Sequence, residues 1–188
     1  AILFKQSETE KARHNEFVKG AQEAYAAAKF KSTLARQLTR EQLQKWRPGG
    51  TVNLGYEVID ADLEEFSKFP AQVTYLSLEN SGVKGPGLAY VIRHPLDYLS
   101  LNDSSVNDRA FLEIKHIKTL KEFQVDNVSI TDAAFKHLEE LPLQRLSARL
   151  NRLHDDALKY IARIKTLKHL QCGKNSQLTA RGYAELKN

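Results

Sequence analysis

Few residues of this 188-residue chain have the type and spacing that catalysis or metal binding requires. The tripeptide His154-Asp155-Asp156 is the one cluster that resembles a set of metal ligands. It falls where an apolar helical stretch begins, so capping of the free amides in a first helical turn is the simpler interpretation. We therefore predict no metal site.

Motifs that bind nucleotides or supply a nucleophile are absent from the sequence. Gly82-x-x-Gly85-x-Gly87 has the wrong spacing for a dinucleotide fingerprint and follows no βαβ pattern. No phosphate loop, H-E-x-x-H or G-x-S-x-G motif is present. The histidines are scattered and have no nucleophile in register with them. These observations predict a non-catalytic protein that needs no cofactor.

The single cysteine, Cys172, excludes an intramolecular disulfide. It occupies an apolar position of a predicted strand, which indicates a small buried side chain.

A pattern of apolar pairs repeats through most of the chain. The segment Ile-Lys-Thr-Leu-Lys occurs at 117–121 and again at 164–168, 47 residues later, which is two periods of 23.5. Two apolar residues separated by one residue recur in steps of 23 or 24: Val52/Leu54, Leu76/Leu78, Leu99/Leu101, Phe123/Val125, Leu146/Ala148 and Leu170/Cys172. A period of 20 to 29 residues is typical of a leucine-rich solenoid.

Each unit is predicted to contain a short strand, a bend and a helix. The alternation around each pair suits a strand with one buried face. An aliphatic residue that follows the pair is expected in the core: Ile59, Val83, Val106, Ile130, Leu153 or Leu178. Two helical faces are apolar, Ala110/Phe111/Ile114/Ile117 and Ala134/Phe135/Leu138/Leu141. Asp108, Asp132 and Asp155 are expected to cap the helices of their own units.

These units resemble the leucine-rich-repeat family, whose consensus is L-x-x-L-x-L-x-x-N/C. The resemblance covers about Thr51 to Asn188, and the unit length favours the strand-plus-helix branch that includes ribonuclease inhibitor and the F-box-associated repeat proteins. It implies an α/β solenoid with short parallel strands on the concave face and helices on the convex face. The consensus Asn/Cys falls on Ser81, Ser104, Val128, Asn151 and Asn175.

Two units depart from the common pattern. Lys84-Gly85-Pro86-Gly87 replaces the acidic residue of the second unit, which predicts a shortened or displaced helix there. Val128 cannot form the side-chain bonds of the consensus Asn, so an irregular bend is expected in the fourth unit.

We divide the chain into a helical N-terminal cap or connecting segment, 1–50, and a solenoid of about six repeats, 51–188. Residues 7–31 are rich in helix formers, and Thr39-Arg40-Glu41-Gln42 resembles a capping box. The segment suits a cap over the first repeat. The alternative is a partner-binding or membrane-proximal helix, in which case the chain is a sensory or scaffolding region of a larger bacterial protein.

The residues that flank each apolar pair should point outward from the concave face and bind a protein partner. Tyr75 and Tyr98 are expected side by side as anchors, because tyrosine offers apolar area with a polar tip. Arg145 and Arg149 are the expected contacts for acidic groups, with some internal pairing to the acidic step at Glu122 and Asp126. The remaining candidates are Ser77, Ser100, Asn102, Gln124, Ser147 and His169.

Charge is segregated along the sequence. Residues 1–50 carry a net charge of +5, residues 51–142 carry −7 and residues 143–188 carry +7. A basic end favours a protein partner with acidic patches. Nucleic-acid binding by this end is the alternative, and few exposed aromatic residues are available there for base stacking.

The composition also bears on setting and assembly. No apolar run reaches the roughly 18 residues of a membrane span. The lack of disulfide-bonded caps favours a reducing cytoplasm or a bacterial extracytoplasmic compartment over a disulfide-rich eukaryotic secreted setting. The last unit has no evident closing cap, so stacking on another chain at the C-terminal end is expected to be possible.

Overall fold

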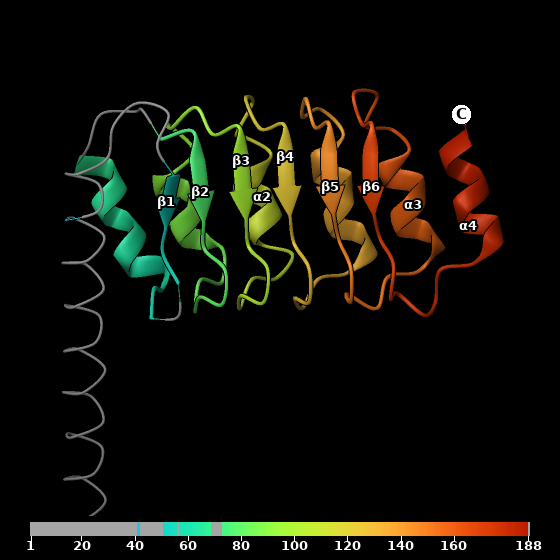
Figure 1. Ribbon diagram of the computed structural model, residues 1–188, viewed down its shortest axis with the longest axis horizontal. Helices are drawn as coiled ribbons and strands as arrows, with labels where there is room; N and C mark the ends of the chain where they lie inside the picture. The colour runs from blue at the N-terminus through green and yellow to red at the C-terminus, as the bar shows by residue number, and fades with distance from the viewer. Residues whose placement is uncertain (1–40, 42–50, 56, 69–72, 188) are drawn as a thin grey trace, which may run out of the picture.

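The computed structural model describes residues 41, 51–55, 57–68 and 73–187. Six short strands form one parallel sheet in the order in which they occur in the chain, so each strand pairs only with its sequence neighbours (Figure 1). The strands are β1 (Thr51–Asn53), β2 (Tyr75–Ser77), β3 (Tyr98–Ser100), β4 (Glu122–Gln124), β5 (Arg145–Ser147) and β6 (His169–Gln171).

A helical segment follows each strand and packs on one face of the sheet (Figure 1). Three segments are short α-helices: α2 (Ala110–Ile114), α3 (Asp155–Ile161) and α4 (Ala180–Ala184). The others are 3-10 helices: η1 (Asp60–Lys68), η2 (Pro86–Tyr90), η3 (Asp132–Leu138) and η4 (Glu185–Lys187). A shortened or displaced helix was expected where Gly85-Pro86-Gly87 replaces the acidic residue, but the five-residue η2 is as long as α2 and α4.

The strands stack in register, with Leu76 opposite Leu99 and Leu99 opposite Phe123. Because side chains alternate between the two faces of a strand, this register places every central residue on the helical side and both of its neighbours on the other side. The predicted α/β leucine-rich-repeat solenoid is thereby confirmed.

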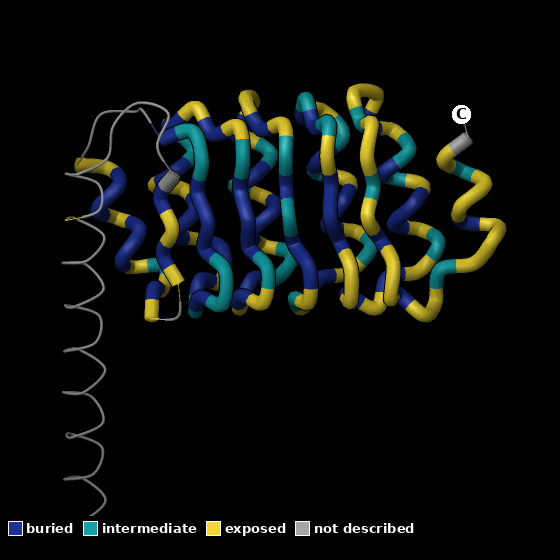
Figure 2. The backbone as a smooth tube through the Cα atoms, viewed as in Figure 1, coloured by how far each residue is buried: buried dark blue, intermediate teal, exposed yellow. Residues whose placement is uncertain are grey.

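The core is one continuous cluster between the sheet and the helices. Both apolar helical faces predicted from the sequence are buried, and Phe111 makes edge-to-face contacts with Phe123 and Phe135 at ring-centroid distances of 5.7 and 5.8 Å. Cys172 is buried, as expected. The central residue of each strand from β2 to β5 is buried, whereas Leu170 of β6 is only partly buried (Figure 2).

One predicted core position is wrong. Ile59 is 42% exposed, and the preceding residue, Val58, is 5% exposed and takes its place in the core. The first unit reaches its aliphatic position one residue early, because a turn in which the Val58 N–H donates to the Gly55 carbonyl shortens the path from β1.

The expected role of the acidic residues is also wrong. Neither α2 nor α3 has a side-chain cap, and the carboxylates instead accept bonds from the following repeat. Thr131 donates its N–H and its hydroxyl to Asp108, at 2.8 and 2.6 Å, and Thr179 donates the same two groups to Asp155. The Thr179 hydroxyl holds the pKa of Asp155 below its usual value. These carboxylates therefore join repeats and do not cap the helices of their own units.

The glycine-rich segment of the second unit also binds a carboxylate from a neighbouring repeat. Asp60 accepts the backbone N–H groups of Lys84, Gly85 and Gly87 at 2.7 to 3.0 Å. Gly85 has a φ of +139°, and a Cβ atom on Gly87 would overlap the Asp60 backbone. The segment forms a nest of N–H groups for an anion, and a carboxylate from the preceding repeat occupies it.

A second series of contacts lies beneath the loops that follow the strands. The Asn151 side chain donates to the Val125 carbonyl at 2.7 Å and accepts the Val128 N–H at 2.8 Å. Asn175 accepts the Asn151 N–H and donates to the Ala148 carbonyl. Asn151 thus supports the bend at Val128 from the next repeat, at the point where an irregular bend was expected.

Most of the N-terminal predictions cannot be compared with the structure. The helix expected over 7–31 lies outside the described residues, and only Glu41 of the capping box is described, in a helix.

Asn151→Ala is expected to lower the free energy of unfolding by about 2–4 kcal/mol, because it leaves one buried N–H and one buried carbonyl without a partner. Ser104→Ala is the matched control at the same repeat position: Ser104 makes one bond, to the Leu101 carbonyl, and the expected loss is about 1 kcal/mol. Urea denaturation of both variants measures the difference, and equal losses would contradict the role assigned to Asn151.

His94 is buried between the first and second repeats. The Val73 N–H donates to Nδ1 at 3.4 Å, Nε2 lies 3.3 Å from the Phe66 carbonyl oxygen, and the ring contacts Phe66 edge-to-face. Burial lowers the pKa of His94, the Phe66 carbonyl raises it in part, and Arg93 lowers it further. The imidazole is therefore neutral in the folded protein near pH 7.

Because the pKa of His94 is lower in the folded state than in the unfolded chain, where it is about 6.5, the unfolded state binds more protons below that pH. The free energy of unfolding should be constant just above neutral pH and fall as the pH drops below about 6.5. Denaturation at several pH values should show that the free energy of unfolding depends less on pH in His94→Gln than in the native protein. Some dependence should remain, since burial and the neighbouring Lys136 and Lys115 also lower the pKa of His137. An unchanged dependence in His94→Gln would contradict this assignment.

Candidate protein-binding surface

The surface opposite the helices, here called the strand face, consists of three rows of residues that cross the sheet. The register aligns Tyr75, Tyr98, Glu122, Arg145 and His169 in the first row. The second row is Asn53, Ser77, Ser100, Gln124, Ser147 and Gln171. The third row comes two residues later and includes Glu79, Asn102, Asp126 and Arg149. All twelve predicted site residues lie in these rows, and their role in binding stays a prediction.

Tyr75 and Tyr98 form a stacked pair on β2 and β3. Their ring centroids are 3.8 Å apart and the ring planes differ by 3°. Both residues are half-buried, so part of the pair faces solvent. Burial raises the pKa of Tyr98, and the neighbouring Tyr75 hydroxyl raises it further. The pair offers apolar surface to solvent, and the Tyr98 hydroxyl is neutral at physiological pH.

The serines of the second row are less accessible than expected. Ser77, Ser100 and Ser147 are all buried, and Ser100 donates to Glu79 at 2.6 Å. Ser147 donates to Asp126 at 2.7 Å. Ser100 and Ser147 therefore support acidic side chains beside them, and all three serines offer little surface to a partner.

Arg145 and Glu122 form an ion pair across β5 and β4. Arg145 Nε donates to Glu122 at 2.7 Å, and its Nη2 contacts the same carboxylate oxygen. The Arg145 side chain is 58% exposed. Solvent weakens an exposed pair of this kind, so Arg145 can exchange its carboxylate for one on a partner at small cost.

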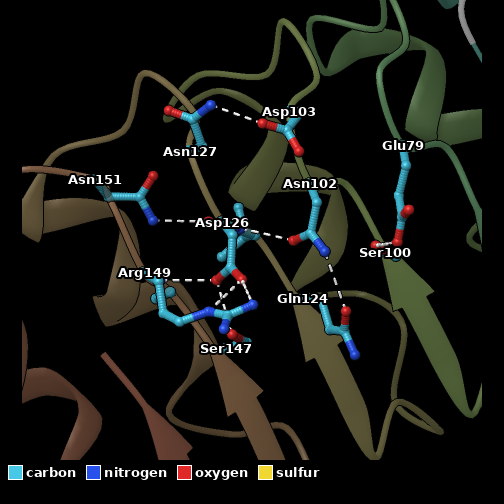
Figure 3. Close-up of polar contacts among 12 residues, drawn as sticks. Glu79, Ser100, Asn102, Asp103, Gln124, Asp126, Asn127, Ser147, Arg149 and Asn151 are labelled. Atoms are coloured by element: carbon cyan, nitrogen blue, oxygen red, sulfur yellow. Dashed lines mark hydrogen bonds and ion pairs between the residues drawn. The ribbon is translucent and has the colours of Figure 1, made fainter. Parts of the chain in front are cut away.

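Arg149 and Asp126 are bound more tightly (Figure 3). Asp126 accepts the Arg149 N–H, the Arg149 Nε–H and the Ser147 hydroxyl, each at 2.7 Å. Asp126 is buried, while the Arg149 side chain is 49% exposed. Arg149 was predicted to contact an acidic partner, but its Nε and Nη2 groups already bind the buried carboxylate of Asp126.

Amide side chains connect these two ion pairs to each other. Asn102 accepts the Asp126 N–H at 2.8 Å and donates to Gln124 at 3.1 Å (Figure 3). Gln124 in turn donates to Glu122 at 3.2 Å. Polar contacts thus run from the loop after β3 through β4 to β5 and hold these side chains in one arrangement.

The basic C-terminal third is partly neutralised. Arg145, Arg149 and Arg163 pair with carboxylates of the preceding repeat. Four other basic residues of the expected basic end, namely Arg152, Lys165, Lys168 and Lys174, form no ion pair with any described residue. These four unpaired cations all lie in the loops of the last two repeats.

The residues considered for metal binding have separate partners. His154 contacts Asp132, Asp155 accepts bonds from Thr179, and Asp156 pairs with Lys159 at 2.7 Å. No group of three His, Cys, Asp or Glu side chains within the described ranges is placed to hold a metal ion. Among the same residues, no helix has the length and apolar character needed to cross a bilayer.

The sequence interpretation missed the loops that follow β4 and β5. An open hollow of about 760 Å³ lies there, with Leu150, Arg152 and His154 on one side and residues 127–133 on the other. A signal was present in the sequence, since Leu150 stands where the three preceding repeats have Asn80, Asp103 and Asn127.

Comparisons with known proteins give similarity at the level of solved structures alone. No protein-family model and no curated protein sequence matches the chain. Internalin C2 of Listeria monocytogenes is similar with a TM-score of 0.48 and 22% identity, over 63% of this chain and 45% of that protein. Internalin F of the same organism gives 0.43 and 15%, over 67% and 47%. The chain thus spans less than half the length of either protein.

Asp126→Ala is expected to lower the free energy of unfolding by about 2–3 kcal/mol, because it removes the acceptor for Ser147 and for two groups of Arg149. Glu122→Gln, the control in the more exposed pair, should cost less than about 1 kcal/mol. Chemical denaturation at moderate salt compares the two, and a larger effect at Glu122 would reverse this ranking.

Proposed function

We propose that the chain is a non-catalytic protein-binding module that recognises a partner on its strand face. The observation that carries this proposal is the stacked, half-exposed pair of Tyr75 and Tyr98. Tyrosines fixed in one conformation lose little side-chain entropy on binding and are common anchors at protein interfaces.

Stability gives no reason for this surface to be aromatic. The sheet is already covered by helices on its other face, and a stacked pair adds only about 0.5–1.5 kcal/mol beyond its buried area. The ordered polar side chains beside the pair suit an interface with an apolar centre and a polar rim.

The charge of the last two repeats supports a partner with acidic patches. Arg145 lies on the same face as the tyrosines and is the arginine more able to bind a partner carboxylate, because its own pair is the more exposed. The unpaired lysines of the last two repeats would accelerate association with such a partner and make binding sensitive to salt. We further assign the repeats to the strand-plus-helix branch of leucine-rich-repeat proteins, since a helical segment follows every strand.

Affinity capture from source lysate at low and high salt tests the proposed function. A Tyr98→Ala, Arg145→Gln bait should lose roughly tenfold or more in affinity for a partner that the native bait retains, because an anchor and a charge are removed. Arg149 is left unchanged, since a substitution there would disturb the buried Asp126.

The matched control bait is Tyr90→Ala, Lys159→Gln, which removes an exposed tyrosine and an exposed cation from the helical side. It should bind as the native protein does, and circular dichroism establishes that both variants are folded. Equal capture by all three baits would reject the strand face as the binding site.

A further inference from the structure

One position of the repeat adopts a left-handed backbone conformation in all five repeats from the second onward. Asn80, Asp103, Asn127, Leu150 and Lys174 have φ between 52° and 61°. Asn and Asp tolerate this conformation, because their short polar side chains bond locally, whereas it is unfavourable for leucine. Leu150 is therefore strained in a way that the three preceding repeats avoid.

Leu150 also interrupts a side-chain contact and exposes apolar surface. The Asn127 amide donates to Asp103 at 2.6 Å, and a leucine in the fifth repeat cannot continue this series (Figure 3). The residue is 47% exposed. Backbone strain and apolar exposure both disfavour the folded state, so stability does not explain a leucine at this position.

The hollow beside Leu150 has the dimensions of a ligand site. Its volume of about 760 Å³ falls within the range of roughly 300–1,000 Å³ that is common for binding clefts. Arg152 lies in its wall, is one of three wall residues with a positive φ (58°), and forms no ion pair with any described residue. Asp132, the acidic residue of the wall, already accepts the His154 N–H at 2.9 Å.

We infer that this hollow binds a segment of a protein partner that carries an aliphatic side chain next to a carboxylate. The aliphatic group would pack on Leu150, and the carboxylate would pair with Arg152. Arg152 is the one Lys or Arg among the described residues of the wall, and its charge favours an acidic segment. No Phe, Tyr or Trp lines the hollow, which argues against stacking of nucleic-acid bases.

This inference rests on the proposed function and extends its site. Arg149 stands in the third row of the strand face and directly precedes Leu150. A partner that crosses the strand face at β5 would therefore reach the hollow without leaving the surface of the protein.

The decisive variant is Leu150→Asn. It restores the residue type of the preceding repeat, so the native backbone is retained with less strain, and Tm should rise by about 2–4 °C. A residue with a purely structural role would lose stability when replaced. Leu150→Asn is expected to become more stable and to lose binding.

The probe is a phage-displayed library of peptides selected on the native protein, from which individual peptides are synthesised and titrated by fluorescence anisotropy. Selected peptides should pair Leu, Ile or Val with a nearby Asp or Glu. Leu150→Asn and Arg152→Gln should each weaken their binding tenfold or more. Lys159→Gln, a cation outside the hollow, should leave it unchanged.

Peptides that bind Leu150→Asn as tightly as the native protein would overturn the inference, as would selection of peptides without acidic residues. Sedimentation showing that the native protein dimerises through Leu150 would assign the hollow to a second copy of the chain and would also overturn it. Tyr98→Ala separates the two proposals. If only Tyr98→Ala loses peptide binding, the strand face is the binding site and the hollow is not. If only Leu150→Asn loses peptide binding, the hollow is the binding site and the strand face is not.

Discussion

Every repeat of this protein completes the hydrogen bonds of its neighbour, and the other features of the structure depend on this constraint. A strand of three residues cannot bury an apolar face or satisfy its backbone by itself, so stability comes from contacts between adjacent units. The carboxylates of Asp60, Asp108 and Asp155 bond to the next repeat, and the amides of Asn151 and Asn175 bond to the preceding one. Contacts with both the preceding and the following repeat hold the units at one spacing. That spacing sets the distances between the side chains of the strand face.

The same constraint shows why the fold could be predicted from the sequence and several polar contacts could not. Apolar pairs at steps of 23 or 24 residues fix the strands and their register, because only one alignment buries all of them. Asp108 and Asp155 illustrate the polar contacts that could not be predicted. An acidic residue at the start of a helical stretch suits a helix cap, and the sequence does not show that a Thr one repeat later is the better donor. Ile59 is a simpler case, since Val58 is equally apolar and one turn decides which of the two is buried.

In the candidate site, too, some contacts could be predicted from the sequence and others could not. The pairing of Tyr75 with Tyr98 follows directly from register, whereas the tight contact between Arg149 and Asp126 depends on rotamers and on a buried serine. Leucine is unfavourable in a left-handed backbone conformation, and only the structure shows that position 150 has this conformation. Departures from a local rule that bring no gain in stability are informative about function.

The two ion pairs of the strand face have the same polarity. Both carboxylates, Glu122 and Asp126, belong to the fourth repeat, and both guanidinium groups, Arg145 and Arg149, belong to the fifth. The surface therefore carries two parallel dipoles that point along the axis of the solenoid. An elongated partner laid across them meets negative charge first in one orientation and positive charge first in the other. Such a surface distinguishes the two directions in which a chain can be laid along it, even where its net charge is close to zero.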